Sequence, residues 1–306
     1  MLRQFHRSSP WRNQWLPTPG VILDLQHPRA RGLLGLWVPH TSPIRGQVND
    51  TGANDIDLLS AIMRDLSPHR RDAVFSPGSL GADVPGQWVI GHNGVGFYIV
   101  SGQNGALKVV PKHTTDWDLQ GAFTVMCRVR LNTLSTADIN TRAFCGRSDG
   151  AGAPTKKWFW AWAEAGYAGV TPANRLFLHN VPQPTGEDTV ATVDWNPATT
   201  EIYTVALTRA ADKTVGFFVD GYRVGDPVAS TLALSIPDSL TLNWGWGEDF
   251  GVNIPGTFFW MKAWERDLSP REVLAEHTSP WEMLRLPMNM AGGSAARGAR
   301  VRAFWY

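Results

Sequence analysis

The sequence predicts an all-β protein in which two antiparallel sheets pack face to face. From Trp88 onward, short apolar runs separated by Gly, Asn and Pro recur every 8–15 residues or so, roughly the spacing of strands in a β-sandwich. The 30 glycines and 21 prolines supply the turns that such a fold requires. Asp220-Gly221, between two strand-like runs, is a strong hairpin signal. A parallel α/β fold would instead alternate its strands with helices.

The elements follow in order along the chain. Residues 1–20 form an N-terminal arm, where Pro17 and Pro19 oppose regular strand pairing. The run from Gly32 to Val38 predicts the first buried strand. A helix is expected over 54–66, because Asn54 can cap it and apolar residues recur at helical spacing after it. Further strands are expected at 87–91, 96–101, 106–110, 122–131, 142–146, 157–163, 174–180, 189–194, 201–208, 213–220, 222–225, 239–244 and 256–265.

A second helix is expected near the C-terminus. Ser269 and Glu272 form a capping-box pattern with Pro270 at the first helical position, and this helix should end at about His277. From residue 285 the composition changes: small residues and a few arginines predominate, and we expect this part of the chain to be flexible. The sequence therefore predicts one sandwich domain over 21–284 between an N-terminal arm, 1–20, and a C-terminal arm, 285–306.

Composition excludes several classes of function. The formal net charge of +1 provides no field that would favour nucleic acid. No apolar run is long enough for a transmembrane helix, and the N-terminus lacks the apolar stretch of a signal peptide, so neither membrane insertion nor export is expected. Cys127 and Cys145 match no zinc or disulfide pattern, and we expect both to stay reduced, as in a protein assembled in cytoplasm.

Several segments resemble one known superfamily, that of the concanavalin A-like lectins and glucanases. The run from Asp24 to Trp37 looks like the opening strand of its laminin-G-like domains, as found in bacteriophage virion proteins. Gly121 to Val125, Tyr203 to Gly221, and Leu268 to Leu284 resemble, in order, an inner strand, the central hairpin and the closing helix. The resemblance covers about residues 20–285 and implies a jelly-roll sandwich of two curved sheets. It implies no single function.

The sequence departs from this family at one loop. Where the family often has Asp-Leu-Ser-Gly-Asn-Gly-Asn, this chain has Asp-Leu-Ser-Pro-His-Arg-Arg-Asp over 65–72. Proline and bulky cations replace glycines that would let a ligand approach the backbone. The loop is therefore a poor candidate for a metal or glycan site.

Hydrolysis on this fold would require two carboxylates that face each other across a sugar cleft. The Glu-x-Asp-x-x-Glu pattern of the family's glucanases is missing, so no catalytic residue is predicted and the protein is not expected to be an enzyme. No cofactor is predicted either. Calcium stays open, because acidic residues that could supply oxygen ligands lie near predicted loops. They are Asp116, Asp118, Asp138, Asp149, Glu248 and Asp249.

The 15 tryptophans offer two interpretations. Trp158, Trp160 and Trp162 alternate on one face of a predicted strand, and Trp244 and Trp246 repeat this pattern. Buried, these rings would form core, which is the commoner use of such residues. Exposed, they would stack on a glycan or on a partner protein.

Two functional hypotheses follow. The first is a structural protein of a bacteriophage particle, assembled in the host cytoplasm as a capsid decoration or a tail component and expected to be a homo-oligomer. Its arms would bind neighbouring virion subunits, because Arg and aromatic residues dominate interface energies. The proposed anchors are Arg297, Arg300, Arg302, Phe304, Trp305 and Tyr306. The alternative is a carbohydrate-binding module that recognises host surface glycan.

Overall fold

A computed structural model describes most of the predicted domain. It describes residues 21–39, 62–76, 87–91, 94–99, 106–109, 119, 121–131, 141–148, 157–163, 173–181, 188–198, 201–230, 234, 242–247, 252–253 and 256–285. Both predicted arms lie outside these residues, apart from Arg285, and so do the six proposed anchors.

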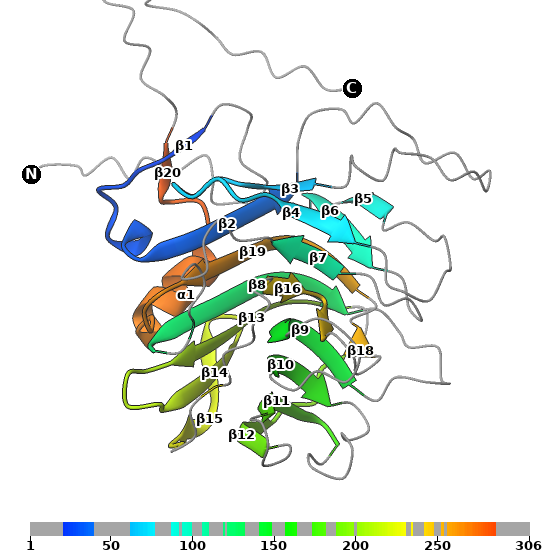
Figure 1. The fold of residues 1–306 in the computed structure, drawn as a ribbon. Helices are drawn as coiled ribbons and strands as arrows, with labels where there is room; N and C mark the ends of the chain where they lie inside the picture. Colours follow the sequence, from blue (N-terminus) through cyan, green and yellow to red (C-terminus); the bar gives the residue numbers. More distant parts are fainter. Residues whose placement is uncertain are drawn as a thin grey trace, which may run out of the picture.

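The strands form one hydrogen-bonded path that bends into two layers (Figure 1). All strand pairs along this path are antiparallel, as the sequence predicts. The first layer runs, in spatial order, through β12 (Asp188–Asp194), β11 (Arg175–Val181), β10 (Lys157–Ala163), β9 (Thr141–Ser148), β16 (Leu242–Trp244), β7 (Ala106–Val109) and β4 (Ala73–Ser76). β3 (Ile62–Asp65) leads into the second layer, β2 (Leu33–Pro39), β19 (Gly256–Trp264), β8 (Phe123–Leu131), β13 (Ile202–Arg209), β14 (Val215–Val219) and β15 (Tyr222–Val228).

Shorter elements complete the described part of the fold. β5 (Gln87–Gly91) pairs with β6 (Gly94–Ile99), which also pairs with β19. Two small ribbons join β1 (Ile22–Leu23) with β20 (Leu284–Arg285), and β17 (Trp246–Gly247) with β18 (Val252–Asn253). The helices are a 3-10 turn, η1 (Pro28–Ala30), and α1 (Pro270–Thr278).

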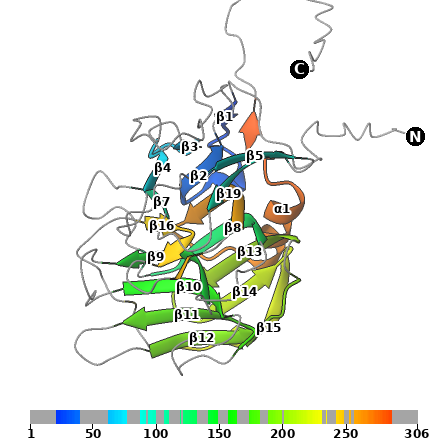
Figure 2. The same cartoon turned by 90° about the vertical axis from the view of Figure 1, so that its right-hand side faces the viewer.

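The two ends of the strand path meet where β12 and β15 lie next to each other (Figure 2). Gly225 in β15 has a positive φ of 67°, and a Cβ there would lie 3.0 Å from Cγ1 of Val193 in β12. Only glycine combines this backbone angle with so close an approach. The contact closes one side of the sandwich.

The main core lies between the two layers. Val125, Cys127 and Val205 of the second layer share one buried cluster with Trp160 and Leu178 of the first. Burial of this much apolar surface is the dominant stabilising contribution to such a fold. The core therefore consists of side chains that point inward from both layers.

The Asp220-Gly221 turn joins β14 to β15 as predicted. Both residues have positive φ, 49° and 83°, as a two-residue type I′ turn requires. The Asp220 carboxylate also accepts a hydrogen bond from the Thr204 N–H at 2.8 Å, and the Asp220 N–H donates to the Thr204 carbonyl at 2.7 Å. The turn is thereby attached to the neighbouring strand β13.

α1 covers the outer face of the second layer (Figure 1). Its predicted capping box is present: the Ser269 hydroxyl accepts from the Glu272 N–H, and the Glu272 carboxylate accepts from the Ser269 N–H. The helix ends at Thr278, one residue beyond the predicted end. Beneath it lies a second buried cluster that includes Phe218, Trp260 and Trp264.

The helix expected over 54–66 is wrong where the structure describes it. Residues 62–65 form β3, and 54–61 lie outside the described residues. Met63 and Asp65 are buried while Arg64 between them is exposed, which is the period of a strand. The Asp65 carboxylate accepts hydrogen bonds from the N–H groups of Leu36, Ser67 and Arg71 at 3.0, 2.8 and 2.8 Å. The bonds from the following loop and from Leu36 of β2, together with the pairing of β3 with β2 and β4, favour the extended conformation over a helix.

The strands expected from 87–91 to 256–265 are confirmed, with ends that shift by three residues or fewer. The prediction missed the short strands β1, β3, β4, β17, β18 and β20. Arg285, which the sequence assigned to the arm, pairs with Ile22 in the β1–β20 ribbon.

Candidate functional site

The structure places four of the five candidate tryptophans in the core. Trp158, Trp160 and Trp162 point inward from β10, as their alternation predicts, and their exposed fractions are 1%, 0% and 1%. Trp244 is 0% exposed in the same cluster. A ring with no exposed face cannot stack on a sugar, so for these four rings the structure favours the first of the two interpretations, a core role, over a stacking surface. The side chain of Trp246, in β17, lies outside the described residues.

A different aromatic pair remains partly open to solvent. Trp195 follows β12, Tyr203 lies in β13, and both are half-buried against the edge of the main core. Their ring centroids are 5.3 Å apart at an interplanar angle of 84°, an edge-to-face pair. Trp195 also lies 5.8 Å from the buried ring of Trp162 and 6.5 Å from that of Phe144.

The backbone around Trp195 is held on both sides. Its N–H donates to the Asn174 carbonyl at 2.9 Å, and its carbonyl accepts from Nε1 of Trp162 at 3.1 Å. Three residues later, the Ala198 N–H donates to the Tyr203 hydroxyl at 3.0 Å. The turn that carries Trp195 is therefore attached to β10, β11 and β13.

Polar groups surround this pair. Arg175 and Asp194 pair across β11 and β12 and form an ion pair of 2.9 Å, in which the Asp194 side chain is 83% exposed. Asn174 and Asn196 are exposed. We call this set of residues the Trp195 corner: Asn174, Arg175, Asp194, Trp195, Asn196 and Tyr203. The sequence pattern did not indicate the Trp195 corner, because Trp195 lies outside any alternating run.

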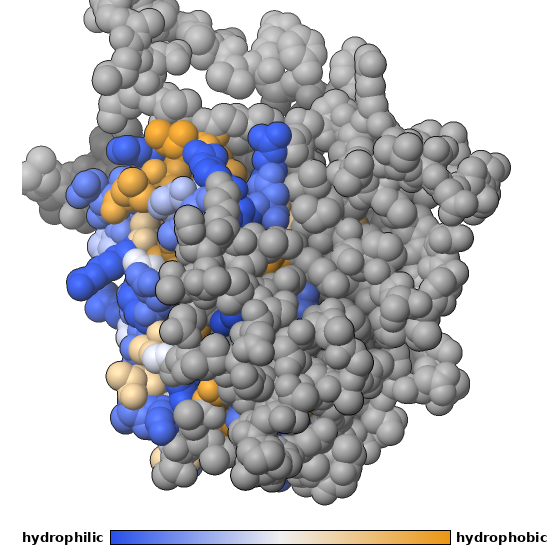
Figure 3. Space-filling model, in the orientation of Figure 1, coloured by the Kyte–Doolittle hydropathy of each residue, from blue (hydrophilic) through white to orange (hydrophobic). Residues whose placement is uncertain are grey.

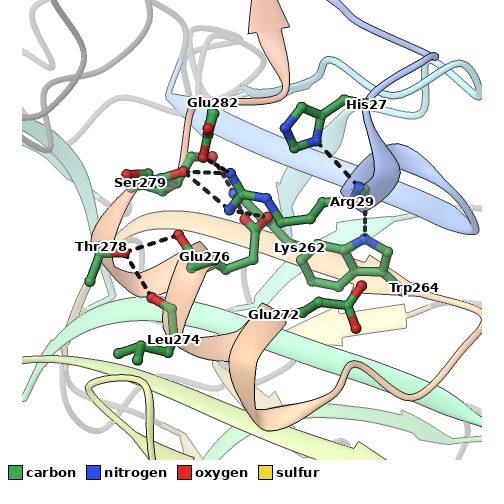
Figure 4. Close-up of polar contacts among 12 residues, drawn as sticks. His27, Arg29, Lys262, Trp264, Glu272, Leu274, Glu276, Thr278, Ser279 and Glu282 are labelled. Carbon is green, nitrogen blue, oxygen red and sulfur yellow. Dashed lines mark hydrogen bonds and ion pairs between the residues drawn. The ribbon is translucent and has the colours of Figure 1, made fainter. Parts of the chain in front are cut away.

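A second polar cluster lies beneath α1 (Figure 4). Lys262 of β19 is 0% exposed, and its ammonium group donates to the Glu276 carboxylate and to the Pro280 carbonyl. The rings of Trp260 and Trp281 lie 4.9 and 5.3 Å from its Nζ. Burial lowers the pKa of Lys262, and the Glu276 carboxylate opposes this shift.

Arg29 extends this cluster to the N-terminal part of the domain. Its Nη1 lies 2.8 Å from Glu276, and its Nη2 lies 2.6 Å from Glu282. The Arg29 carbonyl accepts from Nε1 of Trp264 at 2.8 Å. The cluster connects η1, β19 and α1, and its Lys262–Glu276 pair is buried, so its role is structural.

Neither cysteine is a candidate nucleophile. Cys127 and Cys145 are buried and free, and burial raises the pKa of each thiol well above its ordinary value. Thiolate is the reactive species, so both should be inert.

Metal binding has no support in the described part of the chain, where no group of three or more His, Cys, Asp or Glu could hold an ion. All six acidic residues considered for calcium lie outside it. No described helix is long and apolar enough to cross a membrane.

The described residues next to the two predicted arms lie side by side. In the β1–β20 ribbon Ile22 pairs with Arg285 and Leu23 with Leu284. Apolar surface gathers over this region of the molecule (Figure 3), where Ile22 and Leu25 are 36% and 63% exposed.

Comparison with known proteins found no matching family model and no matching curated protein. Solved structures do match. The binding domain of botulinum neurotoxin DC in complex with rat synaptotagmin II is 10% identical, with a TM-score of 0.52 over 82% of this chain and 52% of that one. The same toxin's binding domain in complex with SialylT is 11% identical, with a TM-score of 0.53 over 82% and 51%.

A structure of botulinum neurotoxin type C, described as dependent for cell entry on two ganglioside molecules, is 12% identical, with a TM-score of 0.53 over 82% of this chain and 51% of that one. The present chain thus spans about half the length of the toxin chains it matches. At such low identity the likeness concerns the fold. The chain has the concanavalin A-like lectin sandwich, the fold that these toxin binding domains share.

Proposed function

We propose that this chain is a non-catalytic, lectin-like module that recognises carbohydrate on a cell surface. The observation that carries the proposal is the sandwich shared with two botulinum neurotoxin structures. One is a binding domain in complex with SialylT, and the other is of a toxin whose cell entry is described as dependent on interaction with two ganglioside molecules. The match covers about half of each toxin chain. The ligands of the toxins therefore suggest only the class of partner for this chain, carbohydrate, and do not identify any residue that contacts it. The partly exposed aromatic pair of the Trp195 corner supplies a surface of the kind that carbohydrate recognition uses.

A glycan array probed with the full chain tests this proposal. We expect binding to a reproducible set of glycans that the same glycan in solution competes away. Mass spectrometry of the glycan after incubation should show it intact. Failure to bind any glycan would contradict recognition, and release of shorter fragments would contradict a non-catalytic role.

A second candidate is a structural subunit of a bacteriophage particle, with a laminin-G-like domain and assembly in the host cytoplasm. The pairing of β1 with β20 favours it, because the described residues that border the two arms then lie side by side, next to the exposed apolar residues Ile22 and Leu25. Segments of about 20 residues that continue the chain from these two neighbouring positions could bind one neighbouring subunit.

Deletion of residues 286–306 tests this second candidate. The shortened protein should fold, as judged by circular dichroism and an unchanged melting temperature, and should no longer enter particles. Normal incorporation of the shortened chain would rule out attachment through the C-terminal arm.

A further inference from the structure

We infer that the Trp195 corner binds a neutral pyranose ring, stacked against Trp195. The inference rests on the proposed carbohydrate recognition and assigns it a site and a class of sugar. No feature of the sequence pattern singled out this site; it exists because the fold brings the end of β12, the start of β11 and the start of β13 together.

The aromatic geometry suits one face of a sugar. The Trp195 ring contacts the core on one side through Trp162 and Phe144, and it remains half-buried rather than enclosed. Tyr203 stands almost perpendicular to it, so the two rings form an angled support. Aromatic faces carry partial negative charge, which attracts the weakly positive C–H groups on the apolar face of a pyranose.

The corner is also preorganised. The N–H and carbonyl of Trp195 are both used in hydrogen bonds, to Asn174 and from Trp162. The Tyr203 hydroxyl accepts from the Ala198 N–H, which fixes the other end of the turn. A ring held in place before binding loses little conformational entropy when the ligand arrives.

The charges around the corner favour a neutral sugar. Arg175 is the cation of the corner, and it is already paired with Asp194 at 2.9 Å. A sialic acid carboxylate at the corner would approach the exposed Asp194 carboxylate, whose partner Arg175 is already engaged. Sugar hydroxyls can instead donate to Asp194 and bond with the amides of Asn174 and Asn196.

Binding measurements on full-length variants test the inference. Trp195→Ala should raise the Kd of the glycan that binds best on the array at least about tenfold. A change of this size corresponds to the loss of about one good aromatic contact. Tyr222→Ala is the matched control: Tyr222 is 68% exposed on the β14–β15 hairpin, outside the corner, and its removal should leave Kd unchanged. Glycans ending in a neutral hexose or N-acetylhexosamine should bind better than their sialylated forms.

A second variant guards against misfolding of Trp195→Ala. Asn196 is exposed, so Asn196→Arg should fold normally while its long side chain covers the neighbouring ring. It should also weaken binding at least about tenfold.

The outcomes separate the two proposals. If the chain binds glycan and a folded Trp195→Ala or Asn196→Arg protein binds it equally well, the site is wrong while carbohydrate recognition stands. Tighter binding of sialylated glycans would contradict the assignment of a neutral sugar to this site. If the unmodified chain binds no glycan, the proposed function itself is wrong, and this site fails with it.

Discussion

Lys262 and Glu276 form an ion pair in which neither side chain is exposed to solvent, between β19 and α1. Arg29 binds the same carboxylate from η1, so one buried acid holds two cations from different parts of the chain (Figure 4). Such an arrangement fixes how α1 docks on the sheet, since any other register would leave a charge buried without its partner.

The first prediction concerns this cluster. Glu276→Gln should destabilise the fold by about 3–5 kcal/mol, because it leaves Lys262 and Arg29 without their shared carboxylate. Urea unfolding followed by tryptophan fluorescence measures this. Glu282→Gln is the control: its side chain is 58% exposed, and its loss should cost less than about 1 kcal/mol. Equal effects of the two substitutions would contradict the structural role assigned to Glu276.

The second prediction concerns the hairpin turn. Gly221 has a φ of 83°, and a Cβ there would lie 2.8 Å from Cδ1 and 3.0 Å from Cα of Leu274 in α1. Gly221→Ala should therefore destabilise the protein by more than about 1 kcal/mol. Gly121→Ala provides the comparison, because a Cβ at Gly121 meets nothing within 4 Å. The denaturation midpoint should fall further for Gly221→Ala than for Gly121→Ala. Equal shifts would contradict the close packing of the turn against α1.

The third prediction concerns pH. Burial lowers the pKa of His277 below its usual value; Asp220, at 3.9 Å, opposes this and Arg128 adds to it. In the window below about 6.5 the unfolded chain then binds more protons at this position than the folded one, so stability falls as the pH falls. His277→Gln should reduce the loss of unfolding free energy between about pH 7.5 and pH 5. The same loss in the variant and the unmodified chain would exclude this contribution.

The fourth prediction concerns the thiols. Cys127 and Cys145, the protein's 2 cysteines, should not react with a thiol reagent at neutral pH in the native state, because both are buried and burial raises both pKa values. Both should react at once in guanidinium chloride. Rapid labelling of either cysteine in the folded protein would show that the core opens at that position.

Much of the fold could be predicted from local patterns. The Asp220-Gly221 turn and the Ser269–Glu272 capping box depend on residues close in sequence, and both are present. β3 could not be predicted in the same way. The apolar spacing around Met63 fits a helix locally, whereas the partners that favour a strand lie in β2, up to 29 residues away in sequence: Leu36 bonds to Asp65, and Trp37 to Pro39 pair with Met63 to Asp65.

The candidate site was harder to predict, for a physical reason. Alternation correctly placed Trp158, Trp160 and Trp162 on one face of β10, but Phe159 and Ala161 on the opposite face are buried as well. Periodicity groups the side chains by face, but it could not say whether either face of β10 is exposed. The position of Trp195 depends on contacts with Trp162 and Tyr203 that form only when the layers close.

Fluorine NMR of the full chain, with 5-fluorotryptophan at its 15 tryptophans, tests the central claim most directly. The Trp195 signal is assigned from its loss in Trp195→Phe. On addition of the best array glycan, the account predicts that this signal shifts while those of the core residues Trp158, Trp160, Trp162 and Trp244 stay in place. A glycan that binds but leaves the Trp195 signal unmoved, or that shifts the core signals instead, would contradict it.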